Sequence, residues 1–414
     1  MTGIEERLAD ALAARAEAVD PASVRPLPAV QRVGRRRARV RGVWLAPVAA
    51  AAAVAVIATV VGIVAHRVVP GIKEGTGGRM PPVPGPLHGA PLAGSSGLRL
   101  LVAADPPFVL NVDTGAVRPV TGLNVKGNPV LSVLAVGSDA VVWLDRRAPS
   151  RSIPRAEIYL VRRGTTRATR IATGWQVVPA DGGRAIWLVS YKDLHHCTLT
   201  EIALDGRTRP RARPISCSTQ LIDSGSRPVL VHGRRVVDPA TGRTLLSTGS
   251  LWAIADGRAL TSTLTRGCPG VSCLGPGRPL TLTDLRTGTR WRLPWPSPIS
   301  FTDQAVVRPD GRLIALDFAD PAYQGGGTQV TDVWLLDPAT RHFRHLPDMP
   351  AAVDLKFTSM AWASERRLVI LAQTGGPSGE RNLVAVWKPG QRQIALRPVR
   401  LPARNSGSDT FVIW

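Results

Sequence analysis

Residues 333–346 read VWLLDPATRHFRHL, an apolar run, an Asp-containing turn and a second run. Residues 235–246 read RVVDPATGRTLL and repeat this pattern with nearly the same turn. In such turns Asp accepts backbone N–H groups, Pro restricts φ, and Gly adopts the left-handed conformation. The pattern therefore predicts a β-hairpin. Hairpins of this form are predicted at residues 108–120, 158–172, 199–210, 235–246, 280–293, 333–346 and 383–396.

A second tight turn precedes most of these hairpins and is followed by an apolar strand. Two consecutive hairpins make one four-stranded unit, and the unit recurs along residues 98–414. Seven such repeats predict an all-β fold, a seven-bladed β-propeller, in preference to a β-sandwich with a smaller β domain. The preceding turns are Gly137-Ser-Asp139, Asp181-Gly-Gly183, Asp256-Gly257, Asp310-Gly311 and Ser364-Glu365.

The two ends of the repeat region complement each other. The first unit begins at Leu98 with strands that match the second, third and fourth strands of a blade. Residues 410–414, TFVIW, form an extra strand without a hairpin partner. We therefore predict that the C-terminal strand closes the first blade, which leaves no open edge at the seam.

One repeat carries a family resemblance. Residues 307–316, VRPDGRLIAL, are similar to the "SPDG, then apolar strand" signature of TolB-like and WD40-like propellers. With a preceding anchor, the layout resembles single-pass propeller proteins of high-GC Gram-positive bacteria. The Trp-Asp and Gly-His signatures of strict WD40 repeats are missing. The resemblance implies a fold and leaves activity and partners open, because propellers carry many unrelated functions.

Residues 43–65 form an uncharged apolar run of 23 residues, VWLAPVAAAAAVAVIATVVGIVA. As a helix it would extend about 35 Å, enough to span the hydrocarbon core. A core helix would show a polar stripe, and a signal peptide has a shorter apolar region. We predict a single-pass membrane helix with a cytoplasmic N-terminus and an extracytoplasmic propeller, since basic residues favour the inside. The Arg residues just before it are Arg32, Arg35, Arg36, Arg37, Arg39 and Arg41.

The segments on either side of this anchor differ in composition. Residues 1–42 start with a capping box, Thr2-x-x-Glu5, and with apolar residues at helical spacing over residues 4–19. This short helix either contacts a cytoplasmic protein or frays, because alone it is marginal in water. Residues 66–97 are rich in Pro and Gly and predict an extended linker.

The chain has four cysteines, all after the predicted anchor. Cys197 and Cys217 are equidistant from the turn at residue 207, so an antiparallel hairpin would place them opposite each other. Cys268 and Cys273 lie in one loop and could close a small ring. We predict two disulfides, with four free thiols as the alternative.

No catalytic, phosphate-binding or cofactor motif occurs in the sequence. His195, His196 and Cys197 are consecutive, and His342 and His345 are three apart, so on strands these groups point to opposite faces. We therefore predict no metal, no cofactor and no enzymatic activity.

The charge and the loops indicate where a partner would bind. The chain carries +22, of which residues 43–414 contribute +18. Such a surface suits an anionic envelope polymer or an acidic protein, unless the arginines are merely scattered. Nucleic acid is not expected, because interleaved aromatics are missing. The long loops between second and third strands predict a binding face, with Arg155, Arg266, Tyr323 and Arg381 as candidate site residues.

Together these features predict a membrane-anchored, extracytoplasmic propeller that acts as a binding or scaffold module for an envelope protein or an anionic ligand. Two alternatives remain open. One is a transmembrane regulator that resembles anti-sigma-like proteins in layout, although no zinc-binding His/Cys set precedes residue 43. The other is a propeller hydrolase or lyase, which would need converging carboxylates or a metal.

Overall fold

The chain divides into two units, Met1–Met80 and Pro81–Trp414, and the computed structural model describes most of the second. The predicted helix over residues 4–19 and the predicted anchor over residues 43–65 lie outside the described residues. Within the described part, no helix is long and apolar enough to cross a membrane. The structure describes residues 84–125, 130–145, 155–193, 195–207, 212–248, 250–262, 279–299, 301–320, 328–354, 359–363, 367–374, 381–402 and 410–414.

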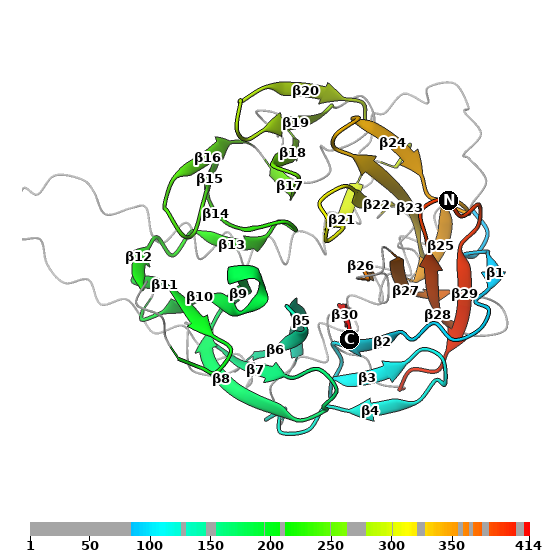
Figure 1. Ribbon diagram of the computed structural model, residues 1–414, viewed down its shortest axis with the longest axis horizontal. Coiled ribbons are helices and arrows are strands. Elements are labelled where there is room, and N and C mark those ends of the chain that lie inside the picture. The colour runs from blue at the N-terminus through cyan, green and yellow to red at the C-terminus, as the bar shows by residue number, and fades with distance from the viewer. Residues whose placement is uncertain are drawn as a thin grey trace, which may run out of the picture. The chain divides into compact units, whose positions relative to one another are not determined.

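The described residues form seven antiparallel sheets around a common axis (Figure 1). Each sheet is a blade with strands A to D from the axis to the rim, which confirms the predicted all-β, seven-bladed propeller. The blades in order are β30 (Phe411–Ile413), β2 (Arg99–Val102), β3 (Phe108–Asn111) and β4 (Val117–Pro119); β5 (Val130–Val136), β6 (Asp139–Asp145), β7 (Ala156–Val161) and β8 (Ala168–Gly174); β9 (Gln176–Ala180), β10 (Ala185–Tyr191), β11 (Cys197–Ala203) and β12 (Arg213–Ile215); β13 (Gln220–Asp223), β14 (Pro228–His232), β15 (Arg235–Val237) and β16 (Thr244–Ser247); β17 (Ser250–Ala255), β18 (Arg258–Ser262), β19 (Leu280–Asp284) and β20 (Arg290–Leu293); β21 (Phe301–Val307), β22 (Ile314–Asp320), β23 (Thr328–Asp337) and β24 (His342–His345); β26 (Ser359–Trp362), β27 (Leu368–Thr374), β28 (Arg381–Trp387) and β29 (Ala395–Val399).

The seven predicted hairpins correspond to the C–D hairpins of the blades, although those at 158–172 and 383–396 have no Asp in the turn and strand D of blade 3 begins after the predicted range 199–210. The turn between β19 and β20 shows how local residues form such a hairpin. Asp284 accepts the backbone N–H groups of Arg286 and Thr287 at 2.9 and 2.8 Å, and Gly288 takes φ 75°, a value that side chains disfavour. Local turn chemistry therefore determines where each blade reverses.

The ring closes as the sequence predicted. β30 pairs with β2 in antiparallel register, with Leu101 opposite Val412. The Trp414 N–H also donates to the carbonyl of Arg99 at 2.7 Å. The last strand of the chain is thus the innermost strand of the first blade, next to the axis (Figure 1).

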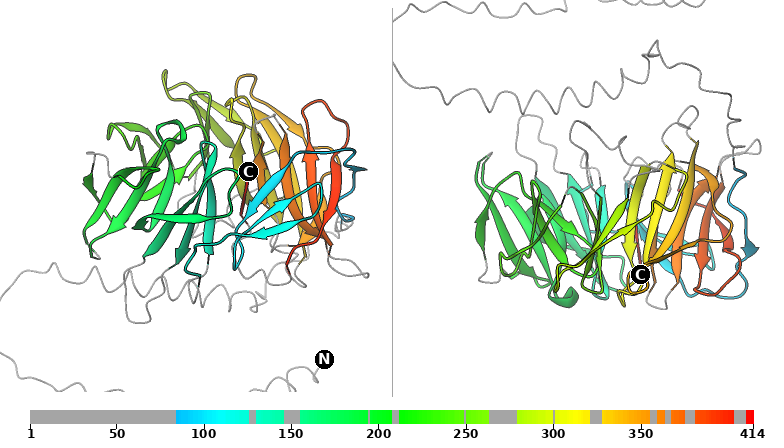
Figure 2. Two further views of the ribbon diagram at one scale, coloured as in Figure 1. Left: turned by 60° about the horizontal axis from the view of Figure 1, so that its bottom comes forward. Right: turned by 90° about the horizontal axis from the view of Figure 1, so that it is seen from above.

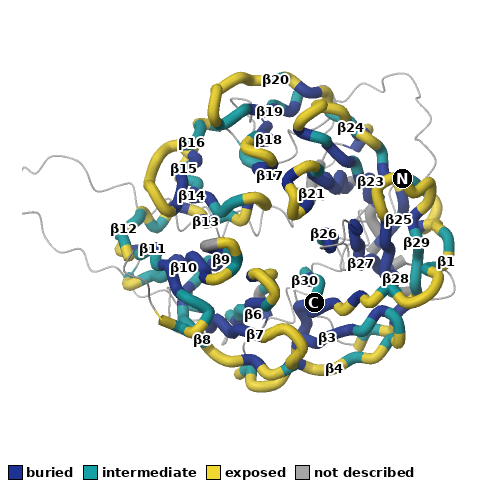
Figure 3. The backbone as a smooth tube through the Cα atoms, in the orientation of Figure 1, coloured by how far each residue is buried: buried dark blue, intermediate teal, exposed yellow. Residues whose placement is uncertain are grey.

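The core lies between the blades. Seven clusters of buried apolar side chains each join two neighbouring blades. Alternation along β23 explains this arrangement, because Val333 and Leu335 face blade 7 while Trp334 and Leu336 face blade 5. The blades stand side by side in Figure 2, and exposure concentrates at turns and the rim in Figure 3.

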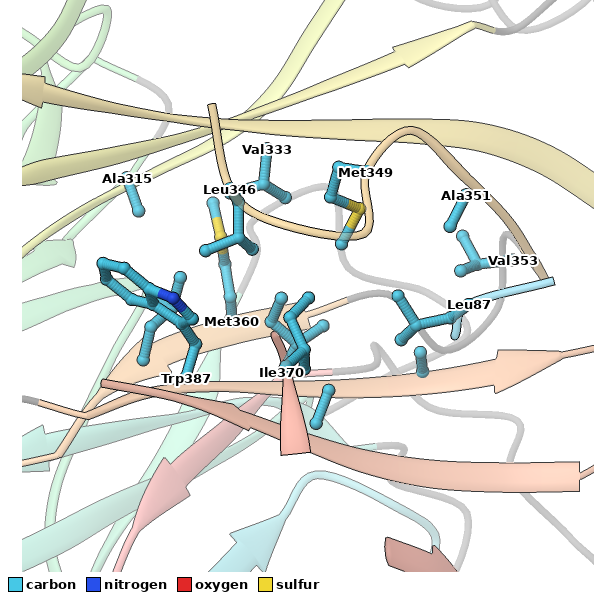
Figure 4. Close-up of a cluster of buried hydrophobic side chains, with 14 of the residues drawn as sticks. Leu87, Ala315, Val333, Leu346, Met349, Ala351, Val353, Met360, Ile370 and Trp387 are labelled. Carbon is cyan, nitrogen blue, oxygen red and sulfur yellow. The ribbon is translucent and has the colours of Figure 1, made fainter. Parts of the chain in front are cut away.

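Residues 84–98, which we call the strap, run along the rim of blades 6 and 7. Within the strap, β1 (Ala90–Pro91) pairs in parallel with β29. Beside it, β25 (Ala351–Asp354) pairs with the first half of β23, and the Ala352 N–H donates to the carbonyl of Gly85 at 2.9 Å. Leu87 is buried against Ala351 and Val353 (Figure 4). Much of the predicted linker, from residue 84 on, therefore belongs to the propeller rim.

Candidate functional site

Two of the predicted site residues lie on the face that carries the B–C loops. Arg155 is half-buried directly before β7 in blade 2, and the backbone of Arg381 pairs with Thr374 at the start of β28 in blade 7. Blade 1 lies between these two positions. Arg266 and Tyr323 lie outside the described residues, as do Cys268 and Cys273. The structure does not bring Arg155 and Arg381 together.

The first predicted disulfide is confirmed. Cys197 and Cys217 are bonded, with Cα atoms 5.1 Å apart, and join strand C of blade 3 to the turn after its strand D. The residue opposite Cys197 is Ile215, whereas the spacing of the two cysteines had predicted Cys217 there. The neighbouring His196 pairs with Asp193 at 2.8 Å. Among the described residues there is no group of three or more His, Cys, Asp or Glu that could hold a metal ion.

The opposite face carries the A–B and C–D turns, and we call it the turn face. Several of its aspartates accept hydrogen bonds from their own turns. Backbone N–H groups of Thr287 and Arg286 hold the pKa of Asp284 below its ordinary value. Asp337 likewise accepts the N–H groups of Ala339 and Thr340 at 2.8 and 3.1 Å. The carboxylates of Asp284 and Asp337 therefore stabilise their own turns, and the neighbouring Arg286 and Arg341 are exposed.

A cavity of about 550 Å³ opens on the turn face between blades 6 and 7, and we call it the aromatic pocket. Its apolar wall includes the buried Trp387 and Leu335. The nine-tenths-buried Arg308 donates from Nε to Asp310 at 2.7 Å, and its guanidinium lies 5.9 Å from the ring centroid of Trp362. The polar lining consists of Arg308, Arg312, Arg344, His342, Thr340 and the turn residue Asp337.

A second cavity, of about 670 Å³, lies between the strap and the C–D turn of blade 7, and we call it the strap pocket. Its charged lining residues are Arg367, Lys388 and Arg392, and its lining includes no Asp or Glu. The strap contributes the hydroxyl groups of Ser95 and Ser96.

A third cavity, of about 230 Å³, lies between blades 1 and 2. Arg99 and Arg118 line it together with Asn111, the C–D turn of blade 2 and Trp414. It too is lined by no Asp or Glu side chain.

These three cavities follow one another along the turn face from blade 6 through blades 7 and 1 to blade 2. We call this stretch the cationic arc. Its lining side chains include several guanidinium groups and one Lys, and the one carboxylate, Asp337, is already bonded to its turn. Such an arrangement attracts anions and offers Arg forks for bidentate contacts with phosphate or carboxylate.

A buried polar group in blade 6 contains Ser, His and Asp but not in a nucleophilic arrangement. Asp332 accepts Ser297 Oγ at 2.6 Å, Trp334 Nε1 at 2.8 Å and His345 Nε2 at 2.5 Å. Burial alone would raise the pKa of Asp332, but the hydrogen bonds from these three groups lower it. Because Ser297 donates to the carboxylate rather than to the imidazole, His345 is not placed to activate it. The network joins blades 5 and 6.

The residues of the cationic arc were not among those predicted from the sequence. Arg308 and Arg312 belong to the quoted stretch VRPDGRLIAL, and Arg344 and Arg392 belong to predicted hairpins. Each looks like an ordinary solvated turn residue in the sequence. A usable signal was present, namely that Arg recurs in these turns while the Asp residues beside it are needed for turn geometry.

No protein-family model matches this chain, and no curated protein sequence matches it. Its fold is similar to that of TolB from Acinetobacter baumannii, with 14% identity over 76% of this chain and 65% of TolB and a TM-score of 0.41. It is also similar to a puromycin-hydrolyzing peptidase of Mycobacterium tuberculosis, with 13% identity over 77% of this chain and 54% of the peptidase and a TM-score of 0.46. The chain thus spans less than two thirds of either protein. These likenesses concern the propeller fold.

Proposed function

We propose that this chain is a binding module that a single helix, residues 43–65, holds at the outer side of the cell membrane. The propeller takes an anionic envelope ligand, a polymer or an acidic protein surface, along the cationic arc. The observation that carries this proposal is the run of three neighbouring cavities whose charged lining is almost entirely cationic.

The repetition of sites along the arc favours a polymeric or extended ligand. A small ion would need only one cavity, whereas a chain of anionic units could contact blades 6, 7, 1 and 2 in succession. Each exposed ion pair contributes little alone, but several act together when one ligand carries all the charges. The basic balance of the chain would add to the attraction at a distance and make binding sensitive to salt.

The test uses the full-length chain in detergent micelles, with poly(glycerol phosphate) and poly-L-glutamate as probes. A variant with Arg312→Glu, Arg344→Glu and Lys388→Glu reverses charge within the arc. We expect its affinity for at least one probe to fall by about tenfold or more, equivalent to about 1.4 kcal/mol.

The matched control reverses the same number of charges on the turn face of blades 3, 4 and 5, with Arg207→Glu, Arg243→Glu and Arg286→Glu, all at exposed positions. We expect this control to lose less than about threefold in affinity. Equal losses in the two variants would show that net charge alone attracts the polymer. That result would overturn the proposed site.

The sequence motif at residues 4–19 favours a second role in which a cytoplasmic protein contacts this segment. Deletion of residues 2–20, with the Arg collar retained, tests it by affinity purification from native membranes. Loss of one cytoplasmic partner, with envelope partners unchanged, would support a transmembrane regulator. Identical sets of partners would exclude that role.

A further inference from the structure

The strap pocket differs from the other two cavities because one of its walls is not part of any blade. The strap forms that wall, and the C–D turn of blade 7 forms the other. The Ala90 N–H donates to the carbonyl of Ile394 at 2.9 Å, and the Leu92 N–H donates to Leu396 at 2.8 Å. The cavity therefore exists only while the strap lies against β29.

The close approach of the strap depends on Gly89. A Cβ atom at this position would lie 2.3 Å from the carbonyl oxygen of Ile394 and 3.0 Å from a side-chain carbon of Leu396. The first contact is with backbone, which cannot move aside without breaking the pairing of β1 with β29. Any side chain at residue 89 would therefore push the strap away from blade 7.

A charged hub fastens the far end of the strap. Arg397 donates to the carbonyls of Leu92 and Gly94 at 2.7 Å and pairs with Asp113. Asp113 also accepts the hydroxyls of Ser95 and Ser96, and Arg367 Nη1 donates to the carbonyl of Ser96 at 2.7 Å. Asp113 thus balances Arg397, and it is not among the residues that line the cavity.

The lining favours a particular chemistry. Lys388 and Arg392 supply positive charge from blade 7, and Ser95 supplies a hydroxyl from the strap. Gln391 and Gln393 add side-chain amides, which suit hydroxyl groups of a ligand. The volume of about 670 Å³ is that of a small-molecule site rather than of a bare ion. A phosphate group carried on a polyol or sugar fits this combination.

We infer that the strap pocket binds a phosphorylated polyol unit and that this unit clamps the strap onto blade 7. The inference rests on the proposed function and names the ligand chemistry at one of its cavities. A ligand that contacts both walls binds only the attached strap, so its binding energy stabilises attachment. By reciprocity, detaching the strap weakens binding by the same factor.

This coupling gives the linker between the predicted anchor and the propeller a role in recognition. The strap is the part of the propeller nearest in sequence to the predicted anchor. Occupancy of the pocket would hold residues 84–98 on the rim, and with an empty pocket they would detach more often. The bound ligand would therefore determine the point at which the linker separates from the propeller rim.

The experiment is hydrogen–deuterium exchange on the full-length chain in detergent micelles, with sn-glycerol 3-phosphate as the probe and inorganic phosphate in a parallel arm. We expect the glycerol ester to slow exchange at the amides of Ala90 and Leu92 at least threefold. Poly(glycerol phosphate) forms a third arm and distinguishes a polymer unit from a free metabolite. If inorganic phosphate protects as well as the ester, the polyol part of the inference is wrong.

Three variants distinguish the contribution of the strap to binding from that of the cationic side chains. Gly89→Ala keeps Arg367, Lys388 and Arg392 but displaces the strap, so we expect affinity for the ester to fall at least tenfold. Lys388→Gln with Arg392→Gln should abolish the protection while the unliganded strap stays attached. Arg344→Gln, in the aromatic pocket, should leave protection unchanged. Exchange in β10 and β11 reports whether each variant is otherwise folded.

The outcomes distinguish this inference from the proposed function. Equal affinity of wild type and Gly89→Ala would show that the strap is no part of the site and would overturn the inference. Polymer binding by wild type without added protection of the strap would also overturn it, while the proposed function would stand. If no probe binds wild type, both fail.

Discussion

The seam of the propeller and blade 4 lie across the ring from each other (Figure 1), and they are built differently. At the seam, the two ends of the described chain meet inside blade 1, where β30 pairs with β2, and the strap and the Asp113 hub join blade 1 to blade 7. In blade 4 the chain is continuous, and the strands have three to five residues, much like those of blade 1. The apolar cluster between blades 4 and 5 has four buried residues, Val229, Val236, Ile254 and Ala259.

This contrast shows that continuity of the chain does not determine where a closed ring is strong. The seam has dedicated contacts from both ends of the described chain, whereas blade 4 shares only a small buried cluster with blade 5. Local opening requires loss of few buried contacts, so it is expected first where those contacts are fewest. We therefore expect blade 4, rather than the seam, to open first.

The largest effect should come from the seam's inner strand. Phe411 is 4% exposed and packs in the cluster between blades 7 and 1. Phe411→Ala should cost about 4 kcal/mol, whereas Val236→Ala in blade 4 should cost about 2 kcal/mol. Urea unfolding gives both values. A larger loss from Val236→Ala would reverse the comparison.

The disulfide between Cys197 and Cys217 stabilises blade 3, which lies beside blade 4. It closes a segment with a sequence separation of 20, and removing such a link typically costs about 3 kcal/mol. The double variant Cys197→Ala/Cys217→Ala should therefore lower the free energy of unfolding by about that much and speed exchange in blades 3 and 4. Unchanged exchange in blade 4, with faster exchange at the seam, would contradict our comparison.

A smaller effect is expected from the hub that holds the strap. Asp113→Asn removes the charge that pairs with Arg397 and should cost about 2 kcal/mol. Asp284→Asn, in the equivalent turn of blade 5, is the matched control with a smaller expected loss, because Asn also accepts turn N–H groups. Exchange at residues 90–98 should rise only in Asp113→Asn.

The same carboxylate gives the strap a pH dependence. Burial would raise the pKa of Asp113, but hydrogen bonds from the Ser96 N–H and hydroxyl, the Ser95 hydroxyl and the Gly97 N–H outweigh this and hold it well below 3.8. Its stabilising contribution is therefore present above about pH 4 and is lost as the pH falls through the lowered pKa. Protection factors of the strap amides, which correct for the slower intrinsic exchange at low pH, that stay unchanged down to pH 2 would show that the carboxylate is not what holds residues 95–97.

The blades could be predicted from the sequence because their reversals depend on neighbouring residues. The turn with Asp337 needs only the N–H groups that follow it. The stretch VWLLDPATRHFRHL therefore contains all the residues that determine its own reversal. The closing strand was predictable by elimination, since the first unit lacked an inner strand. The symmetry of Cys197 and Cys217 about one turn predicted their bond, although the register places Ile215 rather than Cys217 opposite Cys197.

The strap and the cationic arc could not be predicted in this way. Nothing between residues 84 and 98 has strand character, and the segment is placed by Gly89 and Leu87 against blades that lie about 300 residues later in the chain. The arc is a similar case. Arg312 and Trp387 line one cavity only because blades 6 and 7 are neighbours, and a single repeat contains no sign of that.

The position of β30 has a consequence for synthesis of the protein. The ribosome delivers β2, β3 and β4 first, but the inner neighbour of β2 emerges about 300 residues later. Until then the edge formed by Leu100, Leu101 and Val102 has no partner on its inner side. The first blade to be made is thus the last to be finished, and a ribosome that stalls before residue 411 releases a chain with an exposed strand edge that invites aggregation.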